Sequence, residues 1–347
     1  MDQSGTAVRI TGINWFGFET SAYVVNGLWV YSYTRFLNQM KQLGFNTLRI
    51  PFCNDMVRLQ STSLSVINYS VNTDLIGLTP LQILDKVIAY CGTIGLRVIL
   101  DRHSAYAGNL LAEDLWYIPG NSFYTEAQFI ADWVMLAQRY LNNPTVIGFD
   151  LLNEPHYRAT WGNQNPSTDW NNAAQRCGNA ILTVNPKLLI IVEGTTWGRD
   201  LTQVQQFPIR LTVPNKLVYS AHPSYPQSIV GYDPYFNDPT YPNNLAQVWT
   251  STWGYVHINN IAPVWVGEFG SNLQSTSDQL WMAKLKVFLN GDFSFNGTVV
   301  QPPSKGLGYA YWCLNPNSGD TGGILYDDWS TVNYQKMAYL TLDSIIV

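Results

Sequence analysis

The chain of 347 residues carries 19 basic and 24 acidic side chains, which gives a net charge of −5. This acidic balance argues against nucleic acid or an anionic membrane surface as a partner. Aromatic residues make up 14% of the chain and charged residues only 12%, with 13 Trp and 21 Tyr. Such a composition suits a groove that stacks neutral rings better than a site that holds polyanions. No stretch approaches the roughly 20 apolar residues of a membrane helix.

The length fits one α/β barrel, so two domains are not required and we expect a single domain over residues 1–347. The four cysteines lack C-x-x-C spacing, which indicates neither a zinc site nor a disulfide framework. We therefore expect mostly free, buried thiols at Cys53, Cys91, Cys177 and Cys313. The first residues show no basic and apolar leader pattern, so either the protein is cytoplasmic or a signal peptide has been removed.

Short apolar, β-branched runs alternate with helical patterns along the whole chain. The expected strands are 8–14, 46–52, 96–101, 146–152, 188–193, 217–221, 263–268 and 307–312. The expected helices are 32–44, 79–94, 125–142, 169–184, 243–257, 276–290 and 331–345, with a less distinct one near 200–206. This alternation implies parallel strands joined by crossover helices, and the nearly continuous apolar runs indicate strands buried on both faces.

The sequence predicts a closed (β/α)8 barrel, the TIM barrel. An open doubly wound sheet is the rival, but no G-x-G-x-x-G pattern follows the first strand. In a barrel, the polar residues that end the strands collect at one rim, where active sites are found. Here the strand ends supply Asn14, Arg49, Asp101, His103, Asn153, Glu154, Glu193, His222, Glu268 and Trp312.

Two expected strands each deliver a glutamate to their carboxyl end, one in Asn153-Glu154-Pro155 and one in Gly267-Glu268-Phe269. Two carboxyl groups can cut a glycosidic bond if one is held protonated and the other ionised. A gap of about 5–5.5 Å between them gives retention, whereas about 6.5–9.5 Å leaves room for water and gives inversion. The sequence alone leaves this gap open.

Arg49 has two interpretations. It could hold one of the two glutamates ionised, or it could close an internal ion pair with a core acid such as Asp101 or Asp150. Although His and Glu side chains can bind zinc, no H-E-x-x-H spacing is present. The two-glutamate chemistry needs no metal and no cofactor.

With these motifs, the chain resembles the retaining endoglucanases (cellulases) of glycoside hydrolase family 5. The matching segments run in the expected order through nearly the whole chain, at 12–19, 46–51, 100–103, 148–155, 266–270 and 312–323. The resemblance implies that Glu154 is the acid/base and Glu268 the nucleophile. It also implies that Asn153 hydrogen-bonds the 2-hydroxyl of the sugar at the cleavage subsite.

By the same resemblance, His103 binds that sugar and His222 lies against the acid/base. Trp312 forms an apolar floor, and the peptide bond that follows it is expected to be cis. Arg49 and a tyrosine would keep the nucleophile ionised and aimed.

The identity of that tyrosine is open, because the family's His-x-Tyr is here His222-Pro223-Ser224-Tyr225, one residue longer. We choose Tyr225, with Tyr232 and Tyr235 as alternatives.

For several other polar and aromatic residues, the sequence indicates a role in the site less specifically. Trp29 and Trp197 lie in loops after the first and fifth strands, on the catalytic side, where they could stack against sugar rings. Glu193 has no catalytic counterpart in the family, which favours a hydrogen-bonding structural role. His156 and His257 are expected to be structural.

We therefore expect an enzyme that hydrolyses internal β-1,4-glucosidic bonds of cellulose or related β-glucans with retention. Its substrate would be a polysaccharide or oligosaccharide, and we expect a secreted, extracellular monomer. One alternative is a β-mannanase, or a glucanase acting on mixed-linkage glucan or xyloglucan, on the same fold. Another is a sugar-binding barrel without activity, which the presence of both glutamates disfavours.

Overall fold

The computed structural model describes residues 8–108, 113–226, 233–291, 293–295, 298–300 and 306–340. Parallel strands within these ranges close into a barrel in the order β1-β10-β7-β6-β5-β4-β3-β2. Closure is made by β1 against β10, with Gly12 opposite Ala310. The predicted (β/α)8 barrel is confirmed. The strands are β1 (Thr11–Asn14), β2 (Thr47–Cys53), β3 (Arg97–Ser104), β4 (Val146–Asp150), β5 (Leu189–Glu193), β6 (Leu217–Ala221), β7 (Val264–Val266) and β10 (Gly308–Tyr311).

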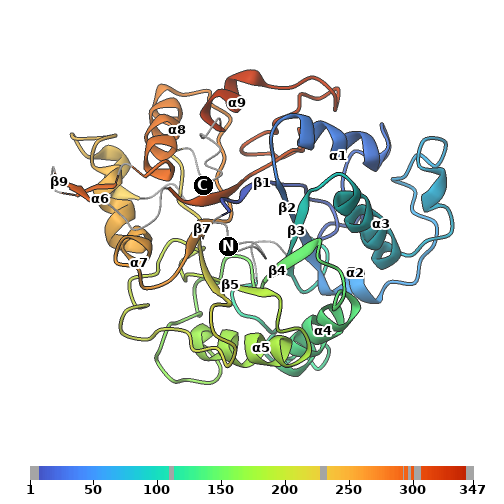
Figure 1. Ribbon diagram of the computed structural model, residues 1–347, viewed down its shortest axis with the longest axis horizontal. Helices are drawn as coiled ribbons and strands as arrows, with labels where there is room; N and C mark the ends of the chain where they lie inside the picture. The colour runs from blue at the N-terminus through green and yellow to red at the C-terminus, as the bar shows by residue number, and fades with distance from the viewer. Residues whose placement is uncertain are drawn as a thin grey trace.

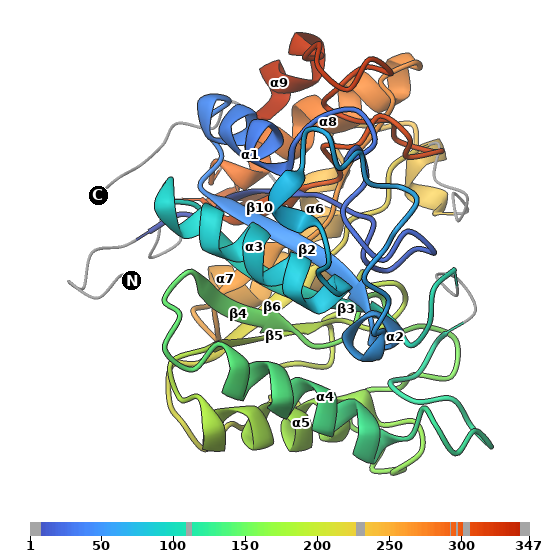
Figure 2. The ribbon, with the colours of Figure 1, turned by 90° about the vertical axis from the view of Figure 1, so that its right-hand side faces the viewer.

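The helices surround the strands, which occupy the centre of the view in Figure 1. Figure 2 shows α3 (Pro80–Thr93) lying across β2 and β3. Helix α3 begins with the predicted capping box, in which Thr79 and Gln82 satisfy each other's backbone N–H groups. The other predicted helices are α1 (Tyr33–Gln42), α4 (Glu126–Arg139), α5 (Trp170–Val184), α8 (Thr276–Leu289), α9 (Tyr334–Leu340) and the run α6 (Leu245–Trp249), a π-helical stretch (Thr250–Gly254) and α7 (Tyr255–Ile258).

The prediction of a helix near 200–206 is wrong. This segment forms turns, and Asp200 Oδ1 accepts hydrogen bonds from the backbone N–H and the hydroxyl of Thr202 at 2.8 and 2.6 Å. Such local side-chain bonds compete with helix formation. Several elements were not expected. They are the short helix α2 (Asn54–Arg58) directly after β2, two 3₁₀ turns (Thr73–Leu75 and Pro234–Asn237), and a hairpin of β8 (Phe293–Phe295) and β9 (Thr298–Val300).

The main core packs the barrel against its helices, while Ile99, Ile191, Trp265 and Ala310 form a separate small cluster from four strands. Such a cluster is typical of the side chains that fill a barrel interior. The four cysteines are free and buried, as predicted. Within the described part of the chain, none of the helices combines the length and apolarity needed to cross a bilayer.

Candidate active site

The carboxyl ends of the strands bring most of the predicted site residues to one mouth. Arg49 and His103 lie within β2 and β3, and Glu193 ends β5. The other residues follow β4, β6, β7 and β10, where the chain leaves the barrel. These are Asn153, Glu154, His222, Glu268 and Trp312.

Arg49 is fully buried and lies among four carboxylates. Its Nη2 is 3.2 Å from Asp101, 2.9 Å from Asp150 and 3.2 Å from Glu193, and its Nη1 donates a short hydrogen bond to Glu268. Arg49 therefore makes the contacts that both interpretations require. It pairs with the core acids and also binds the carboxylate at the end of β7.

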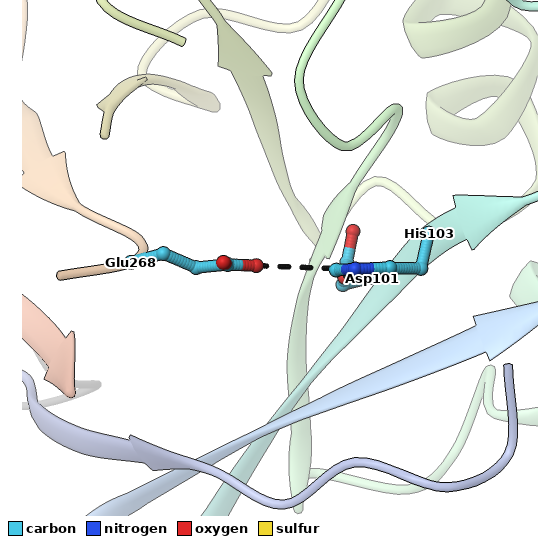
Figure 3. Close-up of side chains that lie close together, drawn as sticks. All are labelled: Asp101, His103 and Glu268. Carbon is cyan, nitrogen blue, oxygen red and sulfur yellow. Dashed lines mark hydrogen bonds and ion pairs between the residues drawn. The ribbon is translucent and has the colours of Figure 1, made fainter. Parts of the chain in front are cut away.

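Glu268 reaches toward β3 as well, as Figure 3 shows. Its Oε1 lies 3.9 Å from His103 Nδ1, which is 2.7 Å from Asp101 Oδ2. Burial alone would lower the pKa of His103, but the charge and hydrogen bond of Asp101 outweigh burial and raise this pKa to about 9. His103 is therefore a second cation beside Glu268.

Glu154 has a different environment. Its Oε1 lies 3.2 Å from His222 Nδ1, and burial lowers the pKa of His222 to about 3, so that this imidazole is neutral. Burial raises the pKa of Glu154 and also that of Glu268. The direct guanidinium contact distinguishes the two, because a hydrogen bond from a charged donor favours the ionised carboxylate. The geometry thus favours an ionised Glu268 and a protonated Glu154.

The gap between the two glutamates is short. One carboxylate oxygen of Glu154, one of Glu268 and a ring nitrogen of His222 all lie within 4.8 Å of one another. This oxygen-to-oxygen gap is close to the separation of about 5–5.5 Å that gives retention and well below the roughly 6.5–9.5 Å that gives inversion. Both side chains keep some exposure, 28% for Glu154 and 13% for Glu268, so a ligand in the mouth could reach both.

Asn153 and Trp312 border this pair. The Asn153 side-chain oxygen accepts a hydrogen bond from Arg49 at 3.1 Å. Its amide nitrogen lies 3.4 Å from His103 Nε2. Because both nitrogens of a charged imidazole donate, this approach is a contact between two donors and leaves the amide hydrogens available to a ligand. Trp312 stacks on the His103 ring at 5.6 Å with an interplanar angle of 12°. The bond from Trp312 to Cys313 is cis, as the resemblance implies. A methyl group on Gly270 would lie 2.1 Å from the Trp312 carbonyl, so this glycine permits the close approach.

A tyrosine was expected to hydrogen-bond Glu268, but the hydroxyls of the two described candidates donate to other residues. The Tyr225 hydroxyl donates to Asp320 Oδ2 at 2.8 Å, and the Tyr235 hydroxyl donates to Asp233 at 2.7 Å. Tyr232 lies outside the described residues. A role for Tyr225 toward the nucleophile stays a prediction.

Asp320 connects Tyr225 to the apolar floor. Ser318 Oγ donates to Asp320 Oδ1 at 3.1 Å and accepts the Trp312 indole N–H at 3.1 Å. Tyr225 therefore links the loop after β6 to the loop that orients Trp312.

The two candidate stacking tryptophans differ in position. The Trp197 ring stacks on His156 at 4.7 Å and 11°. Its backbone N–H donates to the carbonyl of Pro155, so it lies beside the segment that carries Glu154. Trp29 packs edge to face on Trp329 at 4.9 Å and keeps 40% of its surface exposed. Of the two tryptophans, Trp197 is the one that contacts the segment carrying Glu154.

Three groups of side chains have the spacing of possible cation ligands. They are Asp101, His103 and Glu268; Asp150, Glu193 and His222; and Glu154, His222 and Glu268. In each group, at least one carboxylate is paired with Arg49 or lies beside His103. Positive charge at these carboxylates is therefore already supplied by protein side chains. The residues therefore fit a site whose electrostatics come from the protein itself.

Three further polar contacts complete the site. Asp150 was expected as a possible ion-pair partner of Arg49 and Glu193 as a structural hydrogen-bonding residue, whereas Asn14 was given no role in advance. Asn14 Oδ1 accepts from Arg49 at 3.1 Å, Asp150 accepts from the Arg49 Nε at 3.0 Å, and Glu193 accepts the Glu154 backbone N–H at 2.7 Å. In the sequence, these residues could be found from their place at the carboxyl ends of apolar strands, which Glu154 and Glu268 share.

Comparisons with known proteins agree with this geometry. The family model for cellulase (glycosyl hydrolase family 5) matches residues 1–318. An endoglucanase from Paenibacillus polymyxa is 46% identical, over 98% of this chain and 84% of its own length. The major extracellular endoglucanase of Xanthomonas campestris pv. campestris is 41% identical, over 98% of this chain and 68% of its own length.

Solved structures give the same result. The catalytic domain of the Xanthomonas enzyme superposes with a TM-score of 0.86 at 40% identity, covering 98% of this chain and 96% of that domain. An endocellulase from Pyrococcus horikoshii, solved with cellotetraose, superposes with a TM-score of 0.84 at 37% identity, covering 96% and 92% of the two chains. With matches of this extent in sequence and structure, the chain belongs to glycoside hydrolase family 5.

Proposed function

We propose that this protein is an endo-β-1,4-glucanase that cleaves internal bonds of cellulose-like chains with retention. The observation that carries the proposal is the gap of at most 4.8 Å between an oxygen of Glu154 and an oxygen of Glu268 across the barrel mouth. Support for the substrate comes from the relatives, which are named endoglucanases, and from the endocellulase that was solved with cellotetraose.

The reaction proceeds by two displacements. A Glu268 oxygen attacks the anomeric carbon while the glycosidic carbon–oxygen bond breaks, and Glu154 gives its proton to the leaving oxygen. Water then attacks the same carbon, Glu154 takes the proton of that water, and the bond to Glu268 breaks. Glu154 ends protonated and Glu268 ionised, so the enzyme returns to its starting state.

The supporting roles follow from the contacts. Arg49 and His103 keep Glu268 ionised, and Asn153 is oriented by Arg49 to hydrogen-bond the sugar 2-hydroxyl. Trp312 offers an apolar face for the sugar ring, and Trp197 offers a second aromatic face on the Glu154 side.

Secretion is part of this proposal, because one relative is named an extracellular endoglucanase. So are a monomeric state and a single catalytic domain over residues 1–347.

Product analysis tests the function. On soluble cello-oligosaccharides and a soluble cellulose derivative, we expect internal cuts that lower viscosity faster than reducing ends accumulate, with little hydrolysis of mannan. The control is Glu268→Gln, which removes the nucleophile and should abolish turnover while leaving the circular dichroism spectrum unchanged. Preferred cleavage of mannan, mixed-linkage glucan or xyloglucan would favour the alternative specificities, and an active Glu268→Gln enzyme would remove the nucleophile assignment.

The role of Glu154 predicts a dependence on the leaving group. In Glu154→Gln, kcat/KM should fall roughly 10²–10⁴-fold on cello-oligosaccharides, the usual contribution of general acid catalysis. It should fall less than about tenfold on an activated aryl cellobioside, whose leaving group needs little protonation. Glu126→Gln is the matched control, because Glu126 lies on α4 and pairs with Arg176. Equal losses on the two substrates would contradict the acid role.

A double-mutant cycle with Asp320 can show whether the Tyr225 hydroxyl acts through Asp320 or directly on Glu268. Because the hydroxyl donates to Asp320, we expect Tyr225→Phe, Asp320→Asn and the double variant to lower kcat/KM on cello-oligosaccharides by similar factors, about 2–12-fold for one hydrogen bond. If Tyr225→Phe lowers kcat/KM by about 100-fold or more and Asp320→Asn leaves it unchanged, the hydroxyl acts on Glu268 instead.

A further inference from the structure

An exposed tyrosine lies close to Glu154 in the loop after β4. Tyr157 follows Glu154 by three residues and keeps 77% of its surface exposed. Its φ is +42°, in the left-handed region that a bulky residue adopts only at a cost in free energy. Single exposed aromatic rings are common in proteins, but most of them have a relaxed backbone. The strain at Tyr157 therefore needs a physical cause.

Asp114 holds the residues on both sides of Tyr157. Its backbone carbonyl accepts the His156 N–H at 3.4 Å. Its carboxylate accepts three hydrogen bonds from Arg158, one from the backbone N–H at 3.1 Å and two from the guanidinium at 2.7 and 2.6 Å. His156 Nδ1 donates in turn to the Glu154 carbonyl at 2.5 Å. Because a strained conformation persists where its surroundings fix it, these contacts hold Tyr157 in place beside the segment of Glu154.

The rings of His156 and Trp197 lie beside Tyr157. His156 and Trp197 stack in parallel, with centroids 4.7 Å apart and an interplanar angle of 11°. The Tyr157 ring meets both edge to face, 4.7 Å from His156 at 67° and 4.9 Å from Trp197 at 77°. His156 is buried, Trp197 is partly buried and Tyr157 is exposed. These three residues, which we call the aromatic step, therefore lead from the interior to the solvent.

Trp197 is fixed by two neighbouring loops. Its φ is +57°, and its backbone N–H donates to the Pro155 carbonyl at 3.2 Å. The guanidinium carbon of Arg199 lies 5.4 Å from the centroid of the Trp197 ring. Arg199 Nη1 donates to Ser224 at 3.0 Å and to Asp233 at 2.7 Å, in the loop after β6. A surface that is fixed before a ligand arrives loses little conformational entropy when the ligand binds.

The place of the aromatic step in the barrel decides which part of a substrate it meets. The step follows β4 and β5, whereas Trp312 follows β10. Three strands separate β10 from β4 in either direction round the closed barrel, so the two aromatic surfaces lie on opposite sides of the mouth. In the proposed function, Trp312 carries the sugar that Glu268 attacks, and Glu154 protonates the oxygen on the leaving side. A chain that runs from Trp312 past Glu154 therefore reaches the aromatic step with its leaving portion.

We propose that Tyr157, supported by His156 and Trp197, is a specificity residue that stacks on the sugar leaving the cleaved bond. A tyrosine ring offers an apolar face of the kind that packs on a glucosyl ring, and its hydroxyl can bond to a sugar hydroxyl. The inference rests on the retaining reaction of the proposed function, because only that reaction defines a leaving side and a covalent intermediate.

The same ring holds an acceptor sugar in the second displacement. An acceptor hydroxyl oxygen attacks the anomeric carbon in place of water, Glu154 takes the hydroxyl proton, and the bond to Glu268 breaks. A new glycosidic bond forms, Glu154 ends protonated and Glu268 ends ionised. Tyr157 therefore influences how the intermediate divides between transfer to a sugar and hydrolysis.

The ratio of transfer to hydrolysis tests Tyr157. β-Cellobiosyl fluoride serves as donor, because its leaving atom has no ring to stack, and cellobiose serves as acceptor. Both products form from one intermediate, so their ratio does not depend on how much of a variant is folded. In Tyr157→Ala, we expect the ratio at subsaturating cellobiose to fall about 2–12-fold, the contribution of one aromatic contact.

Tyr157→Phe and Tyr334→Ala are the matched controls. Tyr157→Phe keeps the ring, and both variants at this position keep a Cβ, so the strain at a φ of +42° is common to them. Tyr334 has a similar exposure, 72%, but begins α9, which follows β10. Both controls should keep the wild-type ratio. An unchanged ratio in Tyr157→Ala, or an equal loss in either control, would overturn the proposal.

A binding measurement separates this inference from the proposed function. In protein labelled with fluorotyrosine, the ¹⁹F signal that is missing from Tyr157→Phe identifies Tyr157. We expect saturating cellobiose to shift this signal without any turnover. A signal that cellobiose leaves in place would overturn the inference even in an active enzyme. If the wild-type protein cleaves no β-glucan, the proposed function fails, and the ¹⁹F signal still decides whether Tyr157 binds sugar.

Discussion

The mouth of the barrel depends on the buried guanidinium of Arg49. It contacts carboxylates that four different strands deliver, Asp101 from β3, Asp150 from β4, Glu193 from β5 and Glu268 from the end of β7. Buried acids without a cation are strongly destabilising, typically by about 3–5 kcal/mol when one partner of a pair is removed. The contacts form only if the barrel closes with its strands in register. One cation therefore links the stability of the interior to the ionisation of Glu268.

Much of this arrangement could be predicted from the sequence. Apolar runs separated by helical patterns predicted the parallel barrel, and barrel topology places the carboxyl ends of the strands at one rim. Glu154 and Glu268 could therefore be paired, although 113 residues separate them on either side of β5 and β6. The same logic brought Arg49, His103 and His222 to the site.

Other features could not be predicted, because they depend on side-chain partners rather than on strand order. Whether Glu193 points at solvent, at Arg49 or at the Glu154 amide is decided by the register between β4 and β5. The extra residue after His222 changes where Tyr225 reaches, and its hydroxyl meets Asp320 in the loop after β10. The segment near 200–206 has helical composition, but the Asp200 side chain stabilises a turn there.

The gap between Glu154 and Glu268 is too short to hold a water molecule between the Glu268 carboxylate and the sugar. The most direct measurement is the configuration of the newly formed sugar end, followed by ¹H NMR before mutarotation. We expect the β-anomer to accumulate first and the α-anomer to appear only with mutarotation. An α-anomer as the first product would mean inversion, and would contradict the proposed nucleophilic role of Glu268.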